Sequence, residues 1–267
     1  MQSTPSMPSL ESLRLFDSCM TLGDFVYAAC PARITRENAM SVLDRFGITE
    51  ALVHHELARI VHPRRDGNRL LMEEIRGLHR LHPVGVIEPP RVGGRAAARR
   101  GVGELRDAGV RAARLPLRGV PPFAWLWRDL LAELEERRVP CFCDFGAVST
   151  LGELTDADVS GLREIAASHP ALPLVVSHVM GGLGVHPAVP HLVRQMPNLR
   201  LDVSGIMDFA RVIAREVGPE KVLFASGAPF TDPGLLVGTV QYDHELGDAA
   251  KKLVCGDNLR NLLEEAR

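Results

Sequence analysis

The sequence is poor in several residue types that mark particular classes of protein. Only three of its 31 basic residues are lysines, and 33 acidic residues bring the net charge to −2. Aromatic residues make up 5%, and the five cysteines, at positions 19, 30, 141, 143 and 255, have no regular spacing. No apolar run approaches the roughly 18 residues that cross a bilayer. These shortages argue against nucleic-acid binding, a disulfide scaffold and membrane insertion.

What is present is typical of an enzyme-sized globular domain. The chain has 267 residues, of which 46% are hydrophobic, and this is enough to bury a full core. The first residues lack the basic and apolar regions of a secretory signal. We therefore expect residues 1–12 to be a flexible tail, residues 13–267 to form one domain, and the protein to be cytoplasmic with a small-molecule partner.

Short runs rich in Val, Leu and Ile alternate with segments of helical period. Several runs lack polar alternation, which is typical of strands covered on both faces. The predicted strands are Leu13–Cys19, Ala51–His55, Pro83–Ile87, Arg111–Leu115, Pro140–Asp144, Leu174–His178, Leu199–Ser204 and Lys221–Ser226. Eight strand–helix units in order predict an α/β fold, a single (β/α)8 TIM barrel. An open doubly wound sheet is the alternative, but no glycine-rich phosphate loop follows the first strand.

In such a barrel, reactive groups lie where strands end. Side chains two residues apart share a face of a strand. Asp17 and Cys19 are therefore expected to point to the same side of the first strand, and Val176 and His178 to the same side of the sixth. Arg114 ends the fourth strand, where it can bind a substrate carboxylate or form an ion pair at the rim. Further candidates for substrate binding are His54 and Ser226. Of the adjacent pair His54 and His55, only one can face the interior.

The strand ends also carry motifs in a recognisable order. They are Leu15-Phe16-Asp17, Val176-Ser177-His178-Val179-Met180-Gly181-Gly182, Leu201-Asp202-Val203-Ser204, Val222-Leu223-Phe224-Ala225-Ser226-Gly227-Ala228-Pro229 and the closing Gly256-Asp257-Asn258. From about Leu13 to Leu263, the chain resembles the amidohydrolase-related barrels, the branch of metal-dependent hydrolases that includes aminocarboxymuconate-semialdehyde-type decarboxylases. The resemblance implies a barrel enzyme that acts on a small carbonyl, lactone or carboxylic-acid substrate, and it allows a homodimer through the outer helices.

The sequence departs from that family at its metal ligands. The first strand of the family reads Asp-x-His-x-His, whereas Cys19 and Thr21 stand at both histidine positions here. Asp144 replaces the histidine of the fifth strand, Gly227 replaces the aspartate of the eighth, and His178 is kept. A rebuilt site for one divalent ion such as zinc would use Asp17, Cys19, Asp144 and His178. The alternative is that Cys19 and Asp17 are structural.

Without a metal, His178 and Asp144 remain candidates for an acid–base pair in which the carboxylate orients the imidazole. His178 can equally be a core histidine that has found a partner. The sequence thus predicts a divergent hydrolase or decarboxylase with a weakened or absent metal site. A non-catalytic relative that keeps the pocket for binding is the alternative, and a purely structural subunit is a third.

Overall fold

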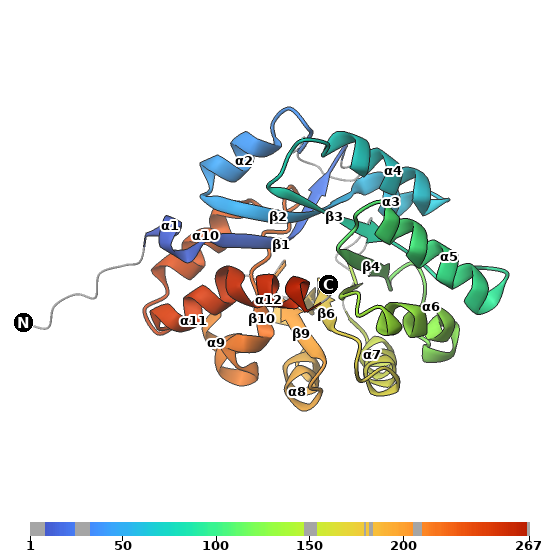
Figure 1. Ribbon diagram of the computed structural model, residues 1–267. Helices are drawn as coiled ribbons and strands as arrows, with labels where there is room; N and C mark the ends of the chain where they lie inside the picture. The colour runs from blue at the N-terminus through green and yellow to red at the C-terminus, as the bar shows by residue number, and fades with distance from the viewer. Residues whose placement is uncertain are drawn as a thin grey trace, which may run out of the picture.

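The computed structural model describes residues 9–24, 33–146, 154–178, 180–181, 184–204 and 210–265. Eight parallel strands form one sheet in the order β1-β2-β3-β4-β5-β6-β9-β10, and helices surround it (Figure 1). The eight strands are β1 (Leu15–Leu22), β2 (Ile48–His55), β3 (Leu81–Val86), β4 (Ala112–Pro116), β5 (Cys141–Asp144), β6 (Leu174–Ser177), β9 (Leu199–Asp202) and β10 (Val222–Leu223). The predicted (β/α)8 barrel is confirmed, and the open-sheet alternative is wrong.

The remaining elements connect these strands, cover their outer faces or, in the case of the last helix, close one end of the barrel. They are α1 (Leu10–Leu13), α2 (Ala39–Arg45), α3 (Glu56–Ile60), α4 (Arg64–Glu74), α5 (Gly94–Asp107), α6 (Ala124–Glu136), α7 (Asp156–Ser168), the hairpin of β7 (Met180–Gly181) and β8 (Gly184–Val185), α8 (Ala188–Gln195), α9 (Ala210–Val217), η1 (Pro219–Lys221), α10 (Pro233–Tyr242), α11 (Asp248–Lys252), the π-helical turn η2 (Leu253–Asp257) and α12 (Asn258–Glu264). In the predicted tail, residues 1–8 lie outside the described residues. Among the described helices, none is long and apolar enough to cross a membrane.

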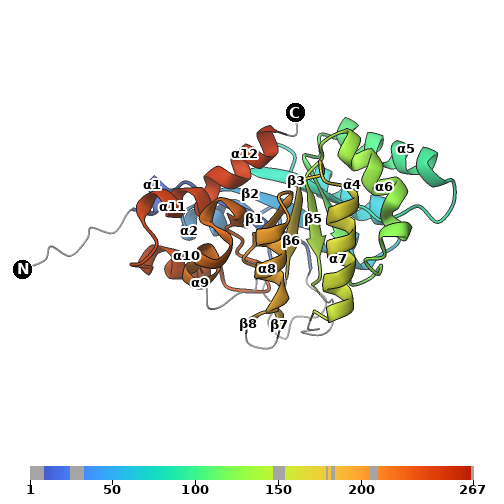
Figure 2. The same ribbon diagram turned by 90° about the horizontal axis from the view of Figure 1, so that it is seen from below.

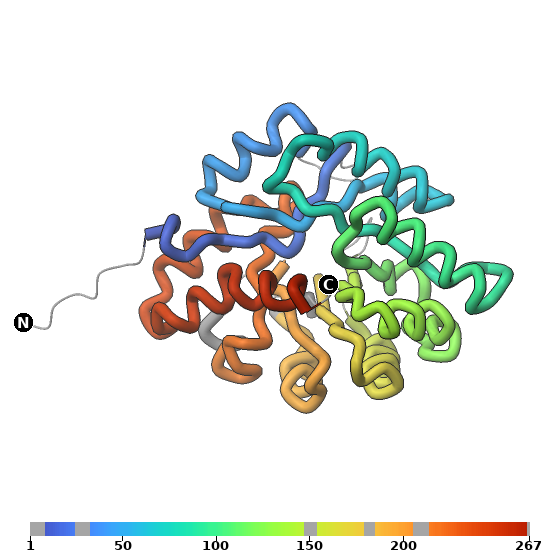
Figure 3. The backbone as a smooth tube through the Cα atoms, viewed as in Figure 1, coloured from blue at the N-terminus to red at the C-terminus, as the bar shows by residue number. Residues whose placement is uncertain are grey.

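The barrel closes where its first and last strands meet (Figure 3). The Ser18 amide donates to the Phe224 carbonyl over 2.9 Å, the Gly227 amide to the Cys19 carbonyl over 3.0 Å, and the Thr21 amide to the Ala228 carbonyl over 2.8 Å. These separate bonds replace a continuous ladder. For this reason β10 is shorter than the predicted Lys221–Ser226, although the segment after it still lines the barrel.

The interior of the barrel has an apolar floor. Seven strands each contribute one buried side chain, and α12 closes the layer with three leucines. The floor consists of Phe16, Leu52, Val84, Ala112, Phe142, Val175 and Leu223, covered by Leu259, Leu262 and Leu263. Figure 2 shows α12 at the end of the barrel opposite to β7 and β8. The polar side chains therefore have to lie at the other end, where the strands finish.

Candidate active site

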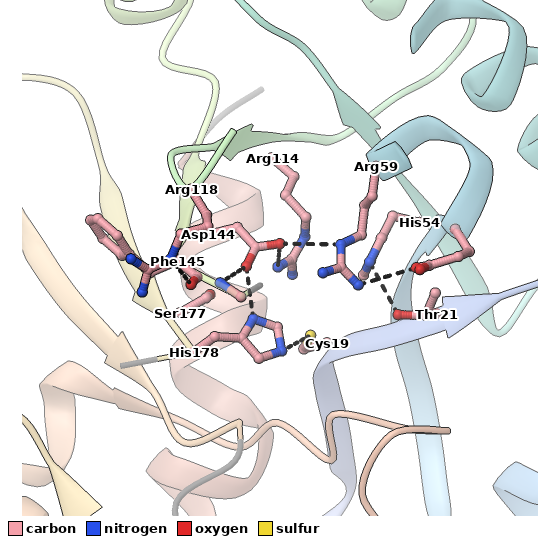
Figure 4. Close-up of polar contacts among 12 residues, drawn as sticks. Cys19, Thr21, His54, Arg59, Arg114, Arg118, Asp144, Phe145, Ser177 and His178 are labelled. Atoms are coloured by element: carbon pink, nitrogen blue, oxygen red, sulfur yellow. Dashed lines mark hydrogen bonds and ion pairs between the residues drawn. The ribbon is translucent and has the colours of Figure 1, made fainter. Parts of the chain in front are cut away.

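The site begins two residues beyond the apolar floor. Because alternate side chains of a strand share a face, Leu52 is followed inside the barrel by His54, Ala112 by Arg114, and Phe142 by Asp144. All three polar side chains are buried. Figure 4 shows them close together, in one network of polar side chains. The structure thus brings together His54, Arg114, Asp144 and His178, four of the residues named as candidates from the sequence.

Asp144 is the centre of this cluster. Its Oδ1 accepts from the Gly146 amide over 2.8 Å and lies 2.9 Å from His178 Nδ1. Its Oδ2 accepts from Arg114 Nη1 over 3.1 Å and lies 3.7 Å from Arg59 Nε. Burial opposes ionisation, but the charges of His178 and Arg114 hold the pKa of Asp144 well below its usual range. The carboxylate is therefore ionised at neutral pH.

His178 reaches Asp144 through an unusual backbone conformation. Strand β6 ends at Ser177, and His178 has a φ of 56°, in the left-handed region that non-glycine residues rarely adopt. Its amide donates to Ser204 Oγ over 3.2 Å. We predicted that His178 shares a strand face with Val176. That face does not orient the imidazole, because Val175, and not Val176, lies in the interior floor. A turn at the strand end aims it.

The imidazole of His178 is positively charged in this setting. Burial lowers its pKa, but the attraction of Asp144 and Cys19 outweighs burial and raises the pKa to about 10. Its Nε2 lies 3.9 Å from Cys19 Sγ, so the two ring nitrogens face different partners (Figure 4). The side chain is 20% exposed, whereas that of Asp144 is 3% exposed. His178 is therefore the member of the pair that solvent or substrate can reach.

Asp17 of β1 and Ser226, which follows β10, were predicted as site residues, but in the structure they are bonded to each other. Asp17 accepts from the Cys19 amide over 2.9 Å and from the Ser226 amide over 2.8 Å, and the Ser226 hydroxyl donates to its other oxygen. Burial raises the pKa of Asp17 to about 7. These bonds tie β1 to the segment after β10. Substrate binding by Ser226 remains a prediction, and in this structure its hydroxyl is bonded to Asp17.

His54 is the neutral histidine of the site. Burial, together with the charges of Arg114 and Arg59, lowers its pKa well below the usual value. Its Nε2 lies 3.1 Å from Thr21 Oγ1. The adjacent His55 faces away from the interior, and its Nδ1 accepts from the Leu57 amide over 3.1 Å at the start of α3. Only one of the two histidines points inward, as the alternation of side chains requires.

Two charged residues of the site were missed by the sequence analysis. Arg59 and Glu56 lie on α3, directly after β2, and Arg59 Nη1 donates to Glu56 Oε2 over 3.1 Å. Glu56 is fully buried, and burial raises its pKa. The signal for this pair was an acidic and a basic residue three apart in the first turn after a strand end. That spacing places both on one helix face.

Several polar atoms in this buried cluster have no hydrogen-bond partner among the described residues. They include Arg114 Nε, Arg114 Nη2, His54 Nδ1 and Glu56 Oε1. The pKa of Arg114 is raised, because Cys19 and Asp144 outweigh burial, so its guanidinium stays charged. Buried donors are normally satisfied, since an unmade hydrogen bond costs about 1–3 kcal/mol. Two guanidinium donors that have no partner in the described part of the chain can therefore bind an anionic group.

The four residues predicted as metal ligands do not form a metal site. Both oxygens of Asp17 are bonded to Ser226 and the Cys19 amide, and both oxygens of Asp144 are taken by His178, the backbone and arginine. His178 contacts both Asp144, through Nδ1 over 2.9 Å, and Cys19, through Nε2 over 3.9 Å, whereas Asp17 is bonded elsewhere. Within the described ranges, no group of three His, Cys, Asp or Glu side chains is placed to hold a metal ion. Because Arg59 and Arg114 add two positive charges, this donor set does not fit a divalent ion.

A closed parallel barrel with a buried, charged cluster where its strands end defines a TIM-barrel protein. The family model described as amidohydrolase matches residues 44–264, and the chain belongs to this family. A search of curated protein sequences finds no match.

Solved structures show the same fold. An uncharacterized TIM-barrel protein from Bordetella bronchiseptica is 18% identical, with a TM-score of 0.71 over 94% of this chain and 99% of that one. The 5-carboxyvanillate decarboxylase from Sphingomonas paucimobilis is 13% identical, with a TM-score of 0.72 over 94% and 99%. The 2,6-dihydroxybenzoate decarboxylase from Rhizobium is also 13% identical, with a TM-score of 0.66 over 95% and 99%.

Proposed function

We propose that this protein is a hydrolase or decarboxylase of a small carboxylate-bearing substrate, with Arg114 as the anchor for the carboxylate and His178 as the proton donor. The observation that carries the proposal is the buried guanidinium of Arg114, whose Nε and Nη2 have no partner among the described residues. A planar carboxylate matches two parallel guanidinium donors in charge and in shape.

The charge of the site supports an anionic substrate. Arg59, Arg114 and the protonated His178 outnumber the ionised Asp144, and the raised pKa of Glu56 weakens its contribution as an anion. The names of two relatives in fold, 5-carboxyvanillate decarboxylase and 2,6-dihydroxybenzoate decarboxylase, describe reactions of carboxylic acids. They support the same substrate class for this chain. A cytoplasmic location and a homodimer remain predictions from the sequence.

His178 supplies the proton in either reaction. In hydrolysis, a water molecule attacks the carbonyl carbon, and the C–O bond to the leaving oxygen breaks as Nε2 gives that oxygen its proton. The neutral imidazole then takes up the proton that the attacking water loses. In decarboxylation, the proton goes to the carbon that carries the carboxylate, so that R–COO⁻ and H⁺ become R–H and CO2. Asp144 keeps Nδ1 bonded and the ring oriented.

The anchor also limits which bond breaks. A carboxylate held by two guanidinium donors is stabilised as an anion, and this stabilisation opposes loss of CO2 from that same group. The carboxylate on Arg114 therefore positions the substrate, and the reaction takes place at a neighbouring group within reach of His178. Substrates that carry both a free carboxylate and a second cleavable acyl or carboxyl group fit this arrangement.

The test is a panel of small lactones, esters and dicarboxylic acids, each paired with a neutral analogue that lacks the free carboxylate. Acid release and CO2 release are measured for the unaltered protein and for His178→Ala and Arg114→Lys. His191→Ala and Arg69→Lys, at exposed positions, are the matched controls. We expect His178→Ala to abolish turnover and Arg114→Lys to raise KM for carboxylate-bearing substrates only.

Equal rates for His178→Ala and the unaltered protein would refute the proposal. The second candidate, a non-catalytic protein that binds a carboxylate, is favoured by the same free donors of Arg114. Calorimetric binding of the carboxylate-bearing compounds without any turnover across the panel would establish that candidate instead.

A further inference from the structure

The sulfur of Cys19 lies in line with the acid–base pair. Cys19 Sγ is 3.9 Å from His178 Nε2, and His178 Nδ1 is 2.9 Å from Asp144 Oδ1 (Figure 4). A nucleophile next to a base that a third group orients is the arrangement used in covalent catalysis. The distance from sulfur to nitrogen is long for a hydrogen bond, but such contacts are often loose without substrate and tighten on binding.

The backbone of Cys19 is fixed on both sides of the sulfur. Its amide donates to Asp17 Oδ1 over 2.9 Å, and its carbonyl accepts from the Gly227 amide over 3.0 Å. These bonds belong to the junction that closes the barrel, so the thiol is carried on a rigid part of the fold. A reacting group needs such support, because small displacements cost large factors in rate.

The charges around Cys19 distinguish it from the other described cysteines. Its sulfur lies 3.9 Å from His178 Nε2, and its attraction is among the causes that raise the pKa of His178 and of Arg114. By contrast, burial raises the pKa of Cys143 and of Cys255 to about 12, and that of Cys141 well above its usual value. Those three thiols are therefore protonated at neutral pH.

We propose that Cys19 is a catalytic nucleophile and that Cys19, His178 and Asp144 act as a thiol–imidazole–carboxylate triad that cleaves carboxylate-bearing lactones or esters through a thioester. This inference rests on the proposed function and selects its hydrolase branch. Cys19 stands at a sequence position where the family resemblance implies a metal-binding histidine. The same position of the first strand would thus serve nucleophilic attack instead of metal binding.

The reaction balances with water as the only co-reactant. The thiolate of Cys19 attacks the carbonyl carbon, a C–S bond forms, and the C–O bond to the leaving oxygen breaks as His178 Nε2 gives that oxygen its proton. The neutral imidazole then takes a proton from water, whose oxygen attacks the thioester carbonyl. The C–S bond breaks, the thiolate is restored, and the acid leaves together with the earlier alcohol.

The first experiment looks for the thioester itself. The probe is mono(4-nitrophenyl) glutarate, with 4-nitrophenyl butyrate as the matched ester without a free carboxylate. We expect a burst of about one nitrophenolate per protein and a glutaryl adduct on Cys19 that hydroxylamine removes. Trypsin leaves Cys19 and Cys30 in one peptide, residues 15–33, so the adduct is mapped in a Cys30→Ser background.

The second experiment compares variants. We expect Cys19→Ala to lose the burst and to slow turnover by about 10³-fold or more, while Cys255→Ala, at another buried cysteine, keeps both. Thermal melts show whether each variant folds. If Cys19→Ala does not fold, the unaltered protein is treated with iodoacetamide instead. The loss of turnover then has to match the fraction of Cys19 that is alkylated.

The outcomes separate the two proposals. Turnover that survives in folded Cys19→Ala, or after complete alkylation of Cys19, but is lost in His178→Ala would overturn the nucleophile and leave the proposed function standing. Turnover without any protein-bound acyl group, even after rapid acid quenching, would do the same. If no carboxylate-bearing compound in the panel is cleaved at all, the proposed function itself fails.

Discussion

His178 and Asp144 are joined across the mouth of the barrel by a 2.9 Å contact between Nδ1 and Oδ1, and the histidine makes it from a left-handed backbone conformation with a φ of 56°. Such a conformation costs about 1–3 kcal/mol and persists only where the surroundings hold it. Here the contact with Asp144 and the bond from the His178 amide to Ser204 hold it. The strained backbone at His178 therefore lowers the stability of the fold, and it places the imidazole against Asp144.

The first prediction concerns this pair. Asp144→Asn keeps the shape of the side chain but removes its charge, so we expect the pKa of His178 to fall from about 10 toward the ordinary value of 6.5. NMR titration of the imidazole measures it. Because the raised pKa stabilises the folded state below about pH 6.5 and this stabilisation is lost toward pH 10, the variant also loses that pH dependence.

Loss of the carboxylate leaves Arg114 and Arg59 without their common counter-charge. Removal of one partner from a buried ion pair costs about 3–5 kcal/mol, and urea unfolding at pH 6 should show a loss of that order. Asp107→Asn, at an exposed position on α5, is the control. An unchanged pKa of His178 in Asp144→Asn would mean that Asp144 is not the group that charges the imidazole.

The second prediction concerns Asp17, whose pKa burial raises from 3.8 to about 7. An unfolded aspartate ionises near pH 4, whereas the folded one ionises near pH 7. Ionisation of this group therefore favours the unfolded chain, and its contribution to stability falls as the pH rises between those values. The difference of about 3 pH units corresponds to about 4 kcal/mol at most.

Asp17→Asn is expected to remove this dependence. An asparagine oxygen can still accept from the amides of Cys19 and Ser226, and its NH2 group can donate to the Ser226 hydroxyl. The free energy of unfolding, measured by urea titration at pH 4.5, 6 and 8, should then fall more steeply with pH in the unaltered protein than in the variant. Parallel pH curves for the two proteins would show that Asp17 does not titrate in this range.

The sequence was sufficient for the strands and their order. Runs such as Leu174-Val175-Val176 are apolar on both faces, and only a covered strand buries them fully, so the barrel followed from eight such runs in sequence. Residues two positions beyond the floor, such as Arg114 and Asp144, could also be placed by alternation. In a regular strand, the alternation of side chains predicts which face of the sheet each residue points to.

The alternation rule does not apply where the backbone is irregular. His178 lies just past a strand end, where one left-handed residue redirects the side chain, and no spacing rule contains that turn. Arg59 lies on a five-residue helix whose position depends on its contact with α4. Its approach to Asp144 is a tertiary distance that joins residues 85 positions apart in the chain. Hydrophobic periodicity carries no information about such a contact.

The third prediction concerns Arg64, which holds the end of α3. Its Nη1 donates to the carbonyls of Ala58 and Arg59 over 2.9 and 2.7 Å, and its Nε donates to Glu88 over 2.6 Å. A lysine cannot supply this fork. We expect Arg64→Lys to cost about 1.5–3 kcal/mol of stability. We also expect KM for a carboxylate-bearing substrate to rise about tenfold, with a smaller change in kcat, because Arg59 loses its position.

Arg65→Lys, at the exposed next position of α4, is the matched control and should leave KM unchanged. Steady-state kinetics with the carboxylate-bearing ester and its neutral analogue separate the two effects, since a change in anchoring affects only the charged ester. An equal rise in KM for both esters would assign Arg64 to general stability of the barrel rather than to the placement of Arg59.

The fourth prediction tests the same helix through packing. A Cβ atom on Gly67 of α4 would lie 2.2 Å from the Ala58 amide nitrogen and 2.5 Å from its Cα, which is closer than any contact that backbone atoms tolerate. Gly67→Ala therefore has to push α3 away and carry Arg59 with it. We expect a loss of about 1–3 kcal/mol in unfolding free energy. We also expect weaker binding of the carboxylate-bearing substrate.

Gly103→Ala is the control for this substitution. Gly103 lies in the middle of α5, has an ordinary helical φ, and would place its Cβ with no heavy atom within 4 Å. Without a clash, alanine should stabilise the helix by about 0.5–1 kcal/mol, because glycine loses more backbone freedom on folding. Thermal unfolding should therefore move in opposite directions for the two variants, with unchanged KM only in Gly103→Ala. A Gly67→Ala protein with normal stability and normal KM would show that α3 can shift without disturbing Arg59.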